Sequence, residues 1–250
     1  MTSLLRLPDA ISACLFDLDG VLTRTAELHA AAWKQTFDAF LQRRSTPDGG
    51  APIPFDARAD YDRYVDGRPR AEGVRSFLAS RDIELPEGSP ADPASANSVH
   101  GVGRRKNELV GELMAKRGVS AYAGSVRFLA AVREAGLGSA VVTSSENASA
   151  VLRAAGLERT FSVQVDGALT HELGLAEKPA PDAFLEAARR LGVSPAHAAV
   201  FEDALAGVAA GRAGGFGLVV GVDRAGQAAE LRARGADVVV EDLAELIDRP

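Results

Sequence analysis

Short apolar runs alternate with helical patterns through the C-terminal half of the chain. The runs have the length of buried strands, and several of the helical patterns between them end at a glycine. Alternating strands and helices predict a parallel sheet covered by helices on both faces. The expected strands are 139–143, 161–165, 198–201, 217–221 and 237–240, and the expected helices are 125–135, 147–155, 181–191, 204–212 and 225–234.

The segment 26–118 lacks this alternation. It contains helical patterns only, separated by loops rich in proline, glycine and polar residues. We therefore expect an α/β core domain of residues 1–25 and 119–250, interrupted after its first strand by an all-helical domain of residues 26–118. Such an insertion would lie over the end of the first strand, where it could admit substrate and then exclude water. The expected helices of the insertion are 26–41, 56–65, 70–81 and 96–117.

Two carboxylates follow the first apolar run. Residues 14–16 are apolar, and Asp17 and Asp19 come directly after them, followed by Gly20. Ligands of parallel α/β folds bind beyond the carboxyl ends of the strands, so this pair is expected at a functional edge of the sheet. A strand followed by an ordinary Asp-Gly turn explains the same stretch equally well when it is taken alone.

Three later segments have the same character. Thr143 and Ser144 follow a strand, Lys178 precedes a helix that begins with proline, and Glu202 and Asp203 follow another strand. Each has an ordinary explanation, as a helix cap or as an exposed lysine. Together, however, they would bring carboxylates, a hydroxyl and a lysine to one edge of the sheet. Hard oxygen ligands suit Mg²⁺, and a carboxylate beside a metal can accept a phosphoryl group.

Composition narrows the range of partners. The chain is 46% hydrophobic and 25% charged, with a net charge of −6, which argues against general binding to nucleic acids or anionic membranes. The single cysteine, Cys14, lies in the first strand, so no internal disulfide can form and a small buried hydrophobe is expected. No apolar run approaches the roughly 20 residues of a membrane span, and no signal peptide is recognisable. We expect a cytoplasmic protein.

The motifs in this order resemble the haloacid dehalogenase superfamily, and most closely its β-phosphoglucomutase branch. The resemblance covers nearly the whole chain and implies a Rossmann-like core with an inserted helical cap. Dehalogenases lack the second aspartate, so Asp19 points to phosphoryl transfer. The four motifs are Asp17–Thr23, Val142–Ser144, Lys178–Asp182 and Glu202–Gly207.

The resemblance assigns a role to each motif residue of the core. Asp17 would be the nucleophile that becomes an aspartyl phosphate, and Asp19 would be the general acid and base. The transferring phosphate would be bound by Thr143, the backbone amide of Ser144 and Lys178. Mg²⁺ would be held by Asp17, the backbone carbonyl of Asp19, Glu202 and Asp203.

The inserted domain carries the residues implied to contact substrate. His29, with Thr25 and Trp33, resembles the hinge and first cap helix of β-phosphoglucomutases, where closure of the cap positions the acid and base. A surface histidine on an amphipathic helix is the alternative. The further substrate contacts implied are Gly67, Arg68 and Arg70 in a specificity loop, Lys106 and Asn107 in a second cap segment, and Ser145 and Asn147 on the core.

Two positions depart from the family pattern. Arg24 stands where an acidic residue is usual, and Glu146 stands where a lysine is frequent. We hypothesise that the two form a reversed ion pair. The loops 43–54 and 85–93 also resemble insertions. The reversed charges and the longer loops both bear on which sugar is bound.

The residues and the resemblance together imply a magnesium-dependent phosphomutase, which would convert β-glucose 1-phosphate to glucose 6-phosphate through a sugar bisphosphate, and we expect it to be a monomer. The alternative within the same family is a sugar-phosphate phosphatase, in which water replaces the sugar as acceptor. A non-catalytic binding module is the alternative from another class. The intact set of Asp17, Asp19, Lys178 and Asp203 argues against it, because binding alone requires no nucleophile.

Overall fold

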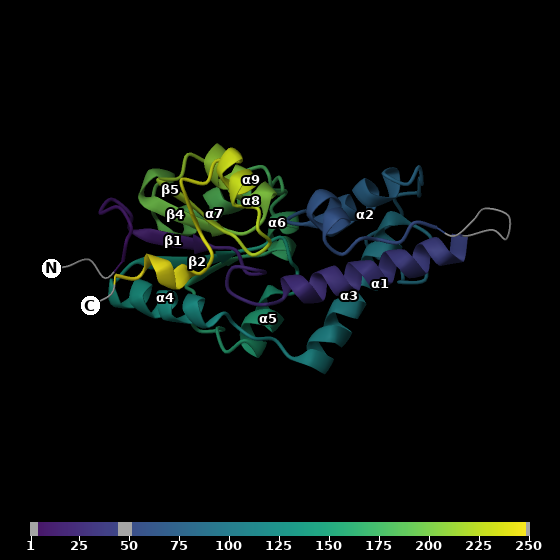
Figure 1. Ribbon diagram of the computed structural model, residues 1–250, viewed down its shortest axis with the longest axis horizontal. Helices are drawn as coiled ribbons and strands as arrows, with labels where there is room; N and C mark the ends of the chain where they lie inside the picture. Colours follow the sequence, from purple (N-terminus) through teal and green to yellow (C-terminus); the bar gives the residue numbers. More distant parts are fainter. Residues whose placement is uncertain (1–4, 45–51, 249–250) are drawn as a thin grey trace. The chain divides into compact units, whose positions relative to one another are not determined.

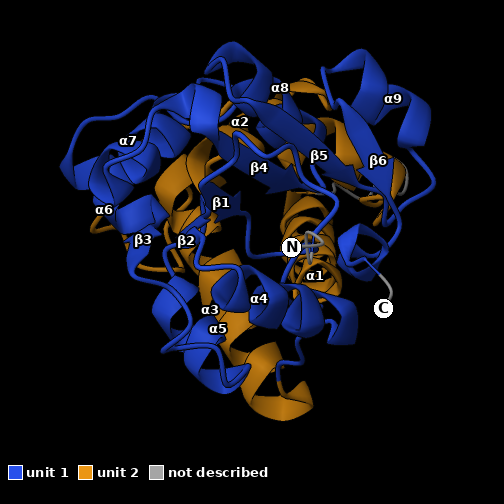
Figure 2. Ribbon diagram, turned by 90° about the vertical axis from the view of Figure 1, so that its left-hand side faces the viewer, with its two compact units in different colours: residues 1–24, 119–250 blue, residues 25–118 orange. Residues whose placement is uncertain are grey.

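The computed structural model describes residues 5–44 and 52–248. The chain forms two compact units, coloured separately in Figure 2. Unit 1 comprises residues 1–24 and 119–250, and unit 2 comprises residues 25–118. Most of the loop expected at 43–54 lies outside the described residues.

Unit 1 is built on a six-stranded sheet with β1 (Ala13–Phe16) near its middle. The strand order is β3-β2-β1-β4-β5-β6, and every neighbouring pair is parallel. All four residues of β1 are buried, as expected for a strand covered on both faces. The other strands are β2 (Gly138–Val142), β3 (Val163–Val165), β4 (Ala198–Glu202), β5 (Leu218–Val222) and β6 (Val238–Val240).

Alternate residues of the central strands face two different helical layers. Leu15 and Val200 belong to a core that includes Phe184 of α7 (Asp182–Leu191) and Val208 of α8 (Leu205–Ala213). On the opposite face, the ring of Phe16 stacks on Phe201 at 4.7 Å and meets Phe128 of α4 (Ala123–Glu134) edge-on. Figures 1 and 2 show the two layers, with α7, α8 and α9 (Ala228–Ala233) on one side of the sheet and α4 and α5 (Ala148–Ala154) on the other. The prediction of a parallel sheet between helical layers is therefore confirmed.

The other helices that the sequence predicted in unit 1 lie close to the expected places. The sequence pattern missed the short helix α6, which begins after Asp166 caps its first turn through the backbone N–H of Leu169, and it missed the 3-10 helices Pro195–His197 and Leu243–Leu246. These α-helices are α4 (Ala123–Glu134), α5 (Ala148–Ala154), α6 (Gly167–Glu172) and α9 (Ala228–Ala233).

The described residues of unit 2 form helices and the loops between them, with no strand. Its helices α1 (Ala26–Arg44) and α3 (Val99–Arg117) pack along each other, and α2 (Arg70–Ala79) packs on α3. An aromatic cluster forms the core. The ring of Phe37 stacks on Trp33 at a ring-centre distance of 4.9 Å and lies tilted against Phe77 at 4.1 Å. These aromatic rings bury large areas, so they give the small unit a core of its own.

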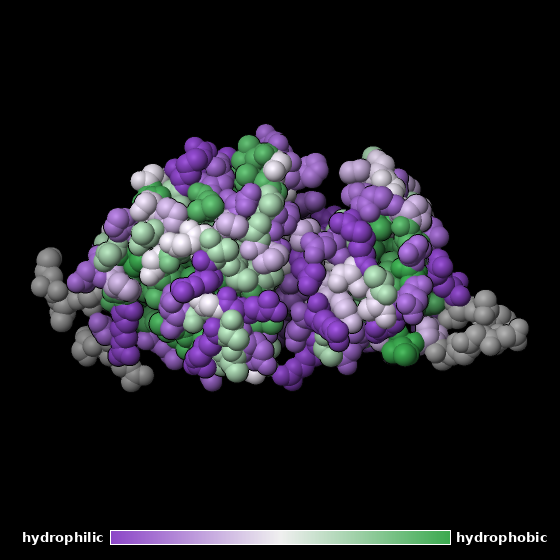
Figure 3. All heavy atoms as spheres, turned by 90° about the horizontal axis from the view of Figure 1, so that it is seen from above, coloured by the Kyte–Doolittle hydropathy of each residue, from purple (hydrophilic) through white to green (hydrophobic). Residues whose placement is uncertain are grey.

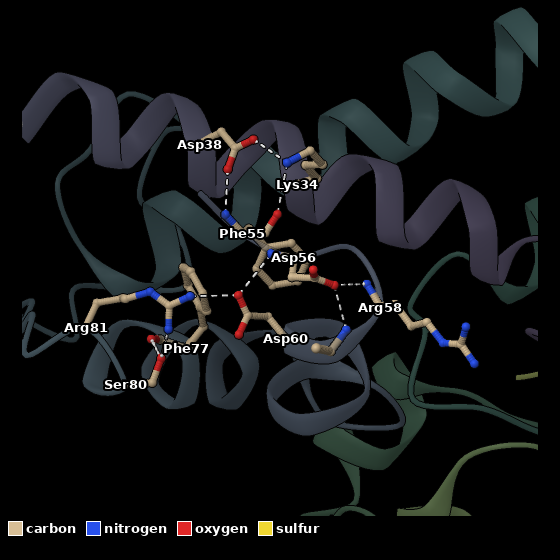
Figure 4. Close-up of polar contacts among 10 residues, drawn as sticks. Lys34, Asp38, Phe55, Asp56, Arg58, Asp60, Phe77, Ser80 and Arg81 are labelled. Carbon is tan, nitrogen blue, oxygen red and sulfur yellow. Dashed lines mark hydrogen bonds and ion pairs between the residues drawn. The ribbon is translucent and has the colours of Figure 1, made fainter. Parts of the chain in front are cut away.

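The helix expected over 56–65 forms, but it is irregular. The carboxylate of Asp56 accepts hydrogen bonds from the backbone N–H groups of Arg58 and Ala59, as a helix cap does, and the segment then widens to one turn of π-helix at Tyr61–Val65. Figure 4 shows how this segment is fixed, with the backbone of Asp56 donating to Asp60 and Asp60 accepting from Arg81.

The segment is also tied to α1. Asp38 accepts a hydrogen bond from the backbone N–H of Phe55 at 2.8 Å, and Lys34 donates to both Asp38 and the carbonyl oxygen of Phe55 (Figure 4). Local polar contacts therefore fix the start of this helical segment against α1.

The visible surface is mixed in character. Figure 3 shows one face, on which hydrophilic side chains cover much of each unit and smaller groups of hydrophobic side chains are scattered among them. Within the described ranges, no helix combines the length and the apolar character required to cross a membrane. Exposed large hydrophobic side chains include Ile53, Val126, Leu173, Leu185 and Val238.

Candidate active site

The candidate site in unit 1 begins where β1 and β4 end. Asp17 follows β1, and its backbone N–H continues the sheet by donating to the carbonyl oxygen of Phe201 at 2.9 Å. Glu202 closes β4 and Asp203 follows it. Because the two strands are adjacent and in register, their ends place these three carboxylates together, as the sequence predicted.

Lys178 joins this group from the loop before α7. Its Nζ lies 2.7 Å from Oδ1 of Asp17 and 2.8 Å from Oε2 of Glu202, and it also donates to the carbonyl oxygen of Val142 at 3.3 Å. The side chain is only 2% exposed, so the interpretation of Lys178 as a surface lysine is wrong. Charge-assisted hydrogen bonds of this length fix both partners.

Burial and crowding shift the titration of these groups. Burial and the neighbouring carboxylate of Glu202 raise the pKa of Asp17 well above its usual range, although the ammonium group of Lys178 opposes the shift. For Lys178, burial would lower the pKa, but the charges of Asp17 and Glu202 outweigh it and hold the pKa above its usual value. Three buried carboxyl groups, those of Asp17, Glu202 and Asp203, thus share one buried lysine.

This carboxylate cluster could hold a divalent metal ion. One oxygen atom from each of Asp17, Glu202 and Asp203 lies within 4.8 Å of the others, and all three residues are buried. Buried carboxylates are costly unless cations compensate them. Glu202 has a second role, because its two oxygens accept hydrogen bonds from Lys178 and from the backbone N–H of Ala204.

Two glycines allow backbone to approach this cluster closely. Gly20 has φ +90°, and a Cβ at this position would lie 1.7 Å from Oδ2 of Asp203. A Cβ on Gly207 of α8 would lie 2.0 Å from the carboxylate carbon of Glu202. The glycines of the first and fourth motifs are thus explained by space around the carboxylates.

The second motif forms a compact turn after β2. The hydroxyl oxygen of Thr143, which is buried, accepts a hydrogen bond from the backbone N–H of Ser145 at 3.1 Å. The hydroxyl oxygen of Ser145 in turn accepts from the backbone N–H of Asn147 at 3.2 Å. Since Lys178 bonds to the carbonyl oxygen of Val142, this turn begins directly beside the carboxylate cluster.

A second group of predicted residues gathers within unit 2. The Nζ of Lys106 lies 3.0 Å from Nδ1 of His29 and 4.9 Å from the ring centre of Trp33. Lys106 is 5% exposed, which is unusual for a lysine and costly without such partners. Thr25 is buried, and its carbonyl oxygen accepts from the backbone N–H of His29.

The expected specificity loop lies before α2. Gly67 has φ +65°, and Arg68 pairs with Glu72 at 2.8 Å. Arg70 begins α2, and its aliphatic stem passes over Gly103, one turn before Lys106 on α3. Asn107, the next residue, is half-buried.

The hypothesised ion pair between Arg24 and Glu146 is wrong. No such pair occurs among the described residues. The guanidinium carbon of Arg24 instead lies 4.7 Å from the ring centre of Tyr122, and its backbone N–H donates to Ser120. Tyr122 also contacts Arg224, a residue that the sequence did not single out. No motif marks Arg224, because its partners are backbone carbonyls distant in sequence.

The comparisons with known proteins agree with this arrangement. The sequence model of haloacid dehalogenase-like hydrolases matches residues 11–215. The chain is 57% identical to a β-phosphoglucomutase of Mycobacterium bovis over 246 residues, which cover 97% of this chain and 94% of that protein. It is 32% identical to a β-phosphoglucomutase of Bacillus subtilis, with coverages of 94% and 92%.

A solved structure has a similar fold. It is a mutant of CbbY from Rhodobacter sphaeroides in complex with xylulose-1,5-bisphosphate, with 28% identity, a TM-score of 0.71, and coverage of 94% of this chain and 96% of that one. On the match across residues 11–215 and the identity to β-phosphoglucomutases, the chain belongs to the haloacid dehalogenase-like hydrolase family and is an enzyme of its β-phosphoglucomutase branch.

Proposed function

We propose that this enzyme is a phosphomutase that converts β-glucose 1-phosphate to glucose 6-phosphate, with Asp17 as the carrier of the phosphoryl group. The observation that supports this most is the buried contact between Lys178 and Asp17 inside a carboxylate cluster. The 57% identity to a β-phosphoglucomutase supports the choice of substrate.

The proposed chemistry has two matched steps. In the first, a carboxylate oxygen of Asp17 attacks phosphorus, so that the new aspartyl O–P bond forms as the bond from phosphorus to the departing oxygen breaks. Asp19 gives a proton to that oxygen. In the second step, Asp19 removes the proton from the accepting hydroxyl of the sugar phosphate, which takes the phosphoryl group from Asp17. The second step converts β-glucose 1-phosphate to glucose 1,6-bisphosphate. The first step takes the phosphoryl group at C1 of that bisphosphate and releases glucose 6-phosphate.

Lys178 and the turn after β2 would stabilise the charge that develops on the phosphoryl oxygens. The ammonium group already lies within hydrogen-bond distance of Asp17, so it needs little reorganisation as the group transfers. Thr143 and the backbone amide of Ser144 would bind the same group from the neighbouring strand end.

The donor set fits Mg²⁺, because buried carboxylate oxygens are the ligands this ion prefers. When bound, Mg²⁺ would offset charge on the phosphate oxygens. The side chains of Asp17, Glu202 and Asp203 and the backbone carbonyl of Asp19 would hold it.

Unit 2 is proposed to recognise the rest of the substrate. His29, Trp33 and Lys106 form a buried polar and aromatic group, and Arg70 passes over the same face of α3. An ammonium group and a guanidinium group suit the non-transferring phosphate, and an aromatic ring suits the apolar face of a sugar. Arg68, Asn107, Ser145 and Asn147 are proposed as further contacts.

The test is an analysis of products by phosphorus NMR. Pure enzyme is incubated with β-glucose 1-phosphate, Mg²⁺ and a trace of glucose 1,6-bisphosphate. Glucose 6-phosphate as the main product, without an equal amount of inorganic phosphate, supports the proposal. No conversion of any sugar phosphate, or conversion that is unchanged in Asp17→Asn, would overturn it.

A sugar-phosphate phosphatase is the second candidate. The observation that supports this candidate is the structural similarity to CbbY, a relative that binds a sugar bisphosphate, xylulose-1,5-bisphosphate, in its crystal structure. The same residues would act, but water would take the phosphoryl group from Asp17. Inorganic phosphate as the main product in the experiment above would identify this reaction.

A further inference from the structure

The loop between β5 and α9, residues 223–227, lies outside all four motifs but has a fixed shape. One oxygen of Asp223, Oδ1, accepts hydrogen bonds from the backbone N–H groups of Ala225, Gly226 and Gln227 at 3.2, 2.7 and 2.8 Å. Three bonds to one carboxylate oxygen close the loop on itself. The side chains it carries are therefore presented from a rigid turn.

Two of those side chains reach the segments that carry the catalytic carboxylates. Arg224 donates from Nε to the carbonyl oxygen of Gly20 at 2.8 Å, and Gly20 is the residue that follows Asp19. Gln227 donates from Nε2 to the carbonyl oxygen of Asp203 at 3.1 Å. One short loop thus binds the backbone that follows β1 and the backbone that follows β4.

These two backbone segments touch each other at the same place. Gly20 lies so close to the carboxylate of Asp203 that any side chain on Gly20 would overlap it. A small shift of either segment would therefore change the distance between Asp19 and Asp203. Hydrogen bonds from a third, rigid segment limit such shifts.

Arg224 is itself held on two further sides. Its guanidinium carbon lies 3.7 Å from the ring centre of Tyr122, and Nη1 donates to the carbonyl oxygen of Glu241. Tyr122 donates its backbone N–H to the carbonyl oxygen of Leu22, in the same segment as Gly20. The arginine fork uses its planar geometry to connect several parts of unit 1 that are distant in sequence.

We infer that Arg224 and Gln227 are positioning residues, which hold Asp19 and Asp203 in register for metal binding and proton transfer. This inference rests on the proposed roles of those two aspartates. Outer groups that orient ligands of a metal site change metal affinity or activity by about 10–100-fold when they are removed. A purely structural arginine would change the stability of the fold and leave metal affinity and kcat as they are.

The test compares Arg224→Met, which keeps the length of the side chain and removes its donors, with Arg234→Met on an exposed helix end. Binding of Mg²⁺ to the whole protein is measured by calorimetry, beside kcat, KM and the unfolding temperature. For Arg224→Met we expect about a tenfold higher Kd for Mg²⁺ and a lower kcat, with little change in KM. Arg224→Lys should recover part of the loss, and Arg234→Met should match wild type.

Gln227→Leu provides a second, milder variant, because Gln227 makes one bond to the site where Arg224 makes contacts on three sides. It should weaken Mg²⁺ binding in the same direction, and it keeps the inference testable if Arg224→Met fails to fold. Folded Arg224→Met or Gln227→Leu with the Mg²⁺ affinity and kcat of wild type would overturn the inference. Persistent activity in Asp17→Asn would instead overturn the proposed function, so the two failures are distinguishable.

Discussion

The Nζ atom of Lys178 lies 2.7 Å from Oδ1 of Asp17, and both side chains are almost completely buried. The same ammonium group contacts Glu202 at 2.8 Å. One lysine therefore bridges the ends of β1 and β4. It fixes the direction in which the carboxylate of Asp17 points, and it provides positive charge where a phosphoryl group would arrive.

Replacing Lys178 with methionine should destabilise the fold and abolish turnover. Two buried carboxylates would lose their shared cation, and breaking a buried pair in this way costs about 3–5 kcal/mol. Chemical denaturation measures the loss. Adding Glu202→Gln to Lys178→Met should restore part of the stability, because one carboxylate then no longer needs the cation. Strictly additive effects of the two substitutions would contradict the shared contact.

Asp17→Asn should lower kcat by about 10³-fold or more while it stabilises the metal-free protein. The pKa of Asp17 is raised in the fold, chiefly by burial and then by Glu202. A carboxyl group with a raised folded pKa binds more protons in the native state than in the unfolded state, so stability falls as pH rises from the unfolded pKa through the folded pKa.

The asparagine variant has no such titration. In EDTA, its unfolding temperature should therefore exceed that of wild type by a margin that grows as pH rises above about 4. Adding Mg²⁺ should narrow the margin by stabilising wild type. A margin that shrinks with rising pH would contradict the raised pKa.

Gly20→Ala should weaken metal binding as well as stability. The added Cβ would overlap the carboxylate of Asp203, and the residue would also be strained at φ +90°. Gly136→Ala is the matched control, because Gly136 has φ +72° with no atom within 4 Å of its added Cβ. The control should lose about 1–2 kcal/mol of stability and keep its Mg²⁺ affinity. Equal Mg²⁺ affinities in the two variants would contradict the close packing of Gly20 on Asp203.

Lys106→Met should impair the turnover of sugar phosphates and leave the hydrolysis of simpler phosphate esters unchanged. The buried ammonium group contacts His29 and Trp33 in unit 2, whereas the proposed phosphoryl chemistry resides in unit 1. We expect KM for β-glucose 1-phosphate to rise about tenfold, with hydrolysis of a small aryl phosphate unchanged. Lys116→Met, at the exposed end of the same helix, serves as the control. Equal losses on both substrates would show that Lys106 supports the fold and not substrate recognition.

The sequence predicted those parts of the fold and site that depend on local pattern. The apolar run of β1 and the polar residues at the ends of β1, β2 and β4 follow from strand burial and from the rule that parallel strands end at one edge. That rule brought Asp17 and Asp203 together across most of the chain's length. The sequence placed Lys178 at this edge of the sheet, but it did not predict that the side chain is buried, because a lysine in a loop is ordinarily exposed.

Contacts between residues that are distant in sequence, and that no local pattern marks, could not be predicted. Arg224 binds the carbonyl oxygen of Gly20 across 204 positions of sequence, and a backbone carbonyl carries no sequence signal. Arg24 contacts the ring of Tyr122 instead of forming the expected ion pair, and no local pattern marks this contact either, because the two residues are far apart in sequence. Over 56–65 the helix widens to a π-turn at Tyr61–Val65, which apolar spacing does not reveal.

The most direct test of the account is to trap the phosphoryl group on the protein. Enzyme incubated with glucose 1,6-bisphosphate and Mg²⁺ is quenched, reduced with borohydride and digested for mass spectrometry. Reduction converts an aspartyl phosphate to homoserine. The account predicts homoserine at Asp17 with Asp19 unchanged, and no such product in Asp17→Asn. Homoserine at another aspartate, or continued turnover with Asp17 never modified, would contradict it.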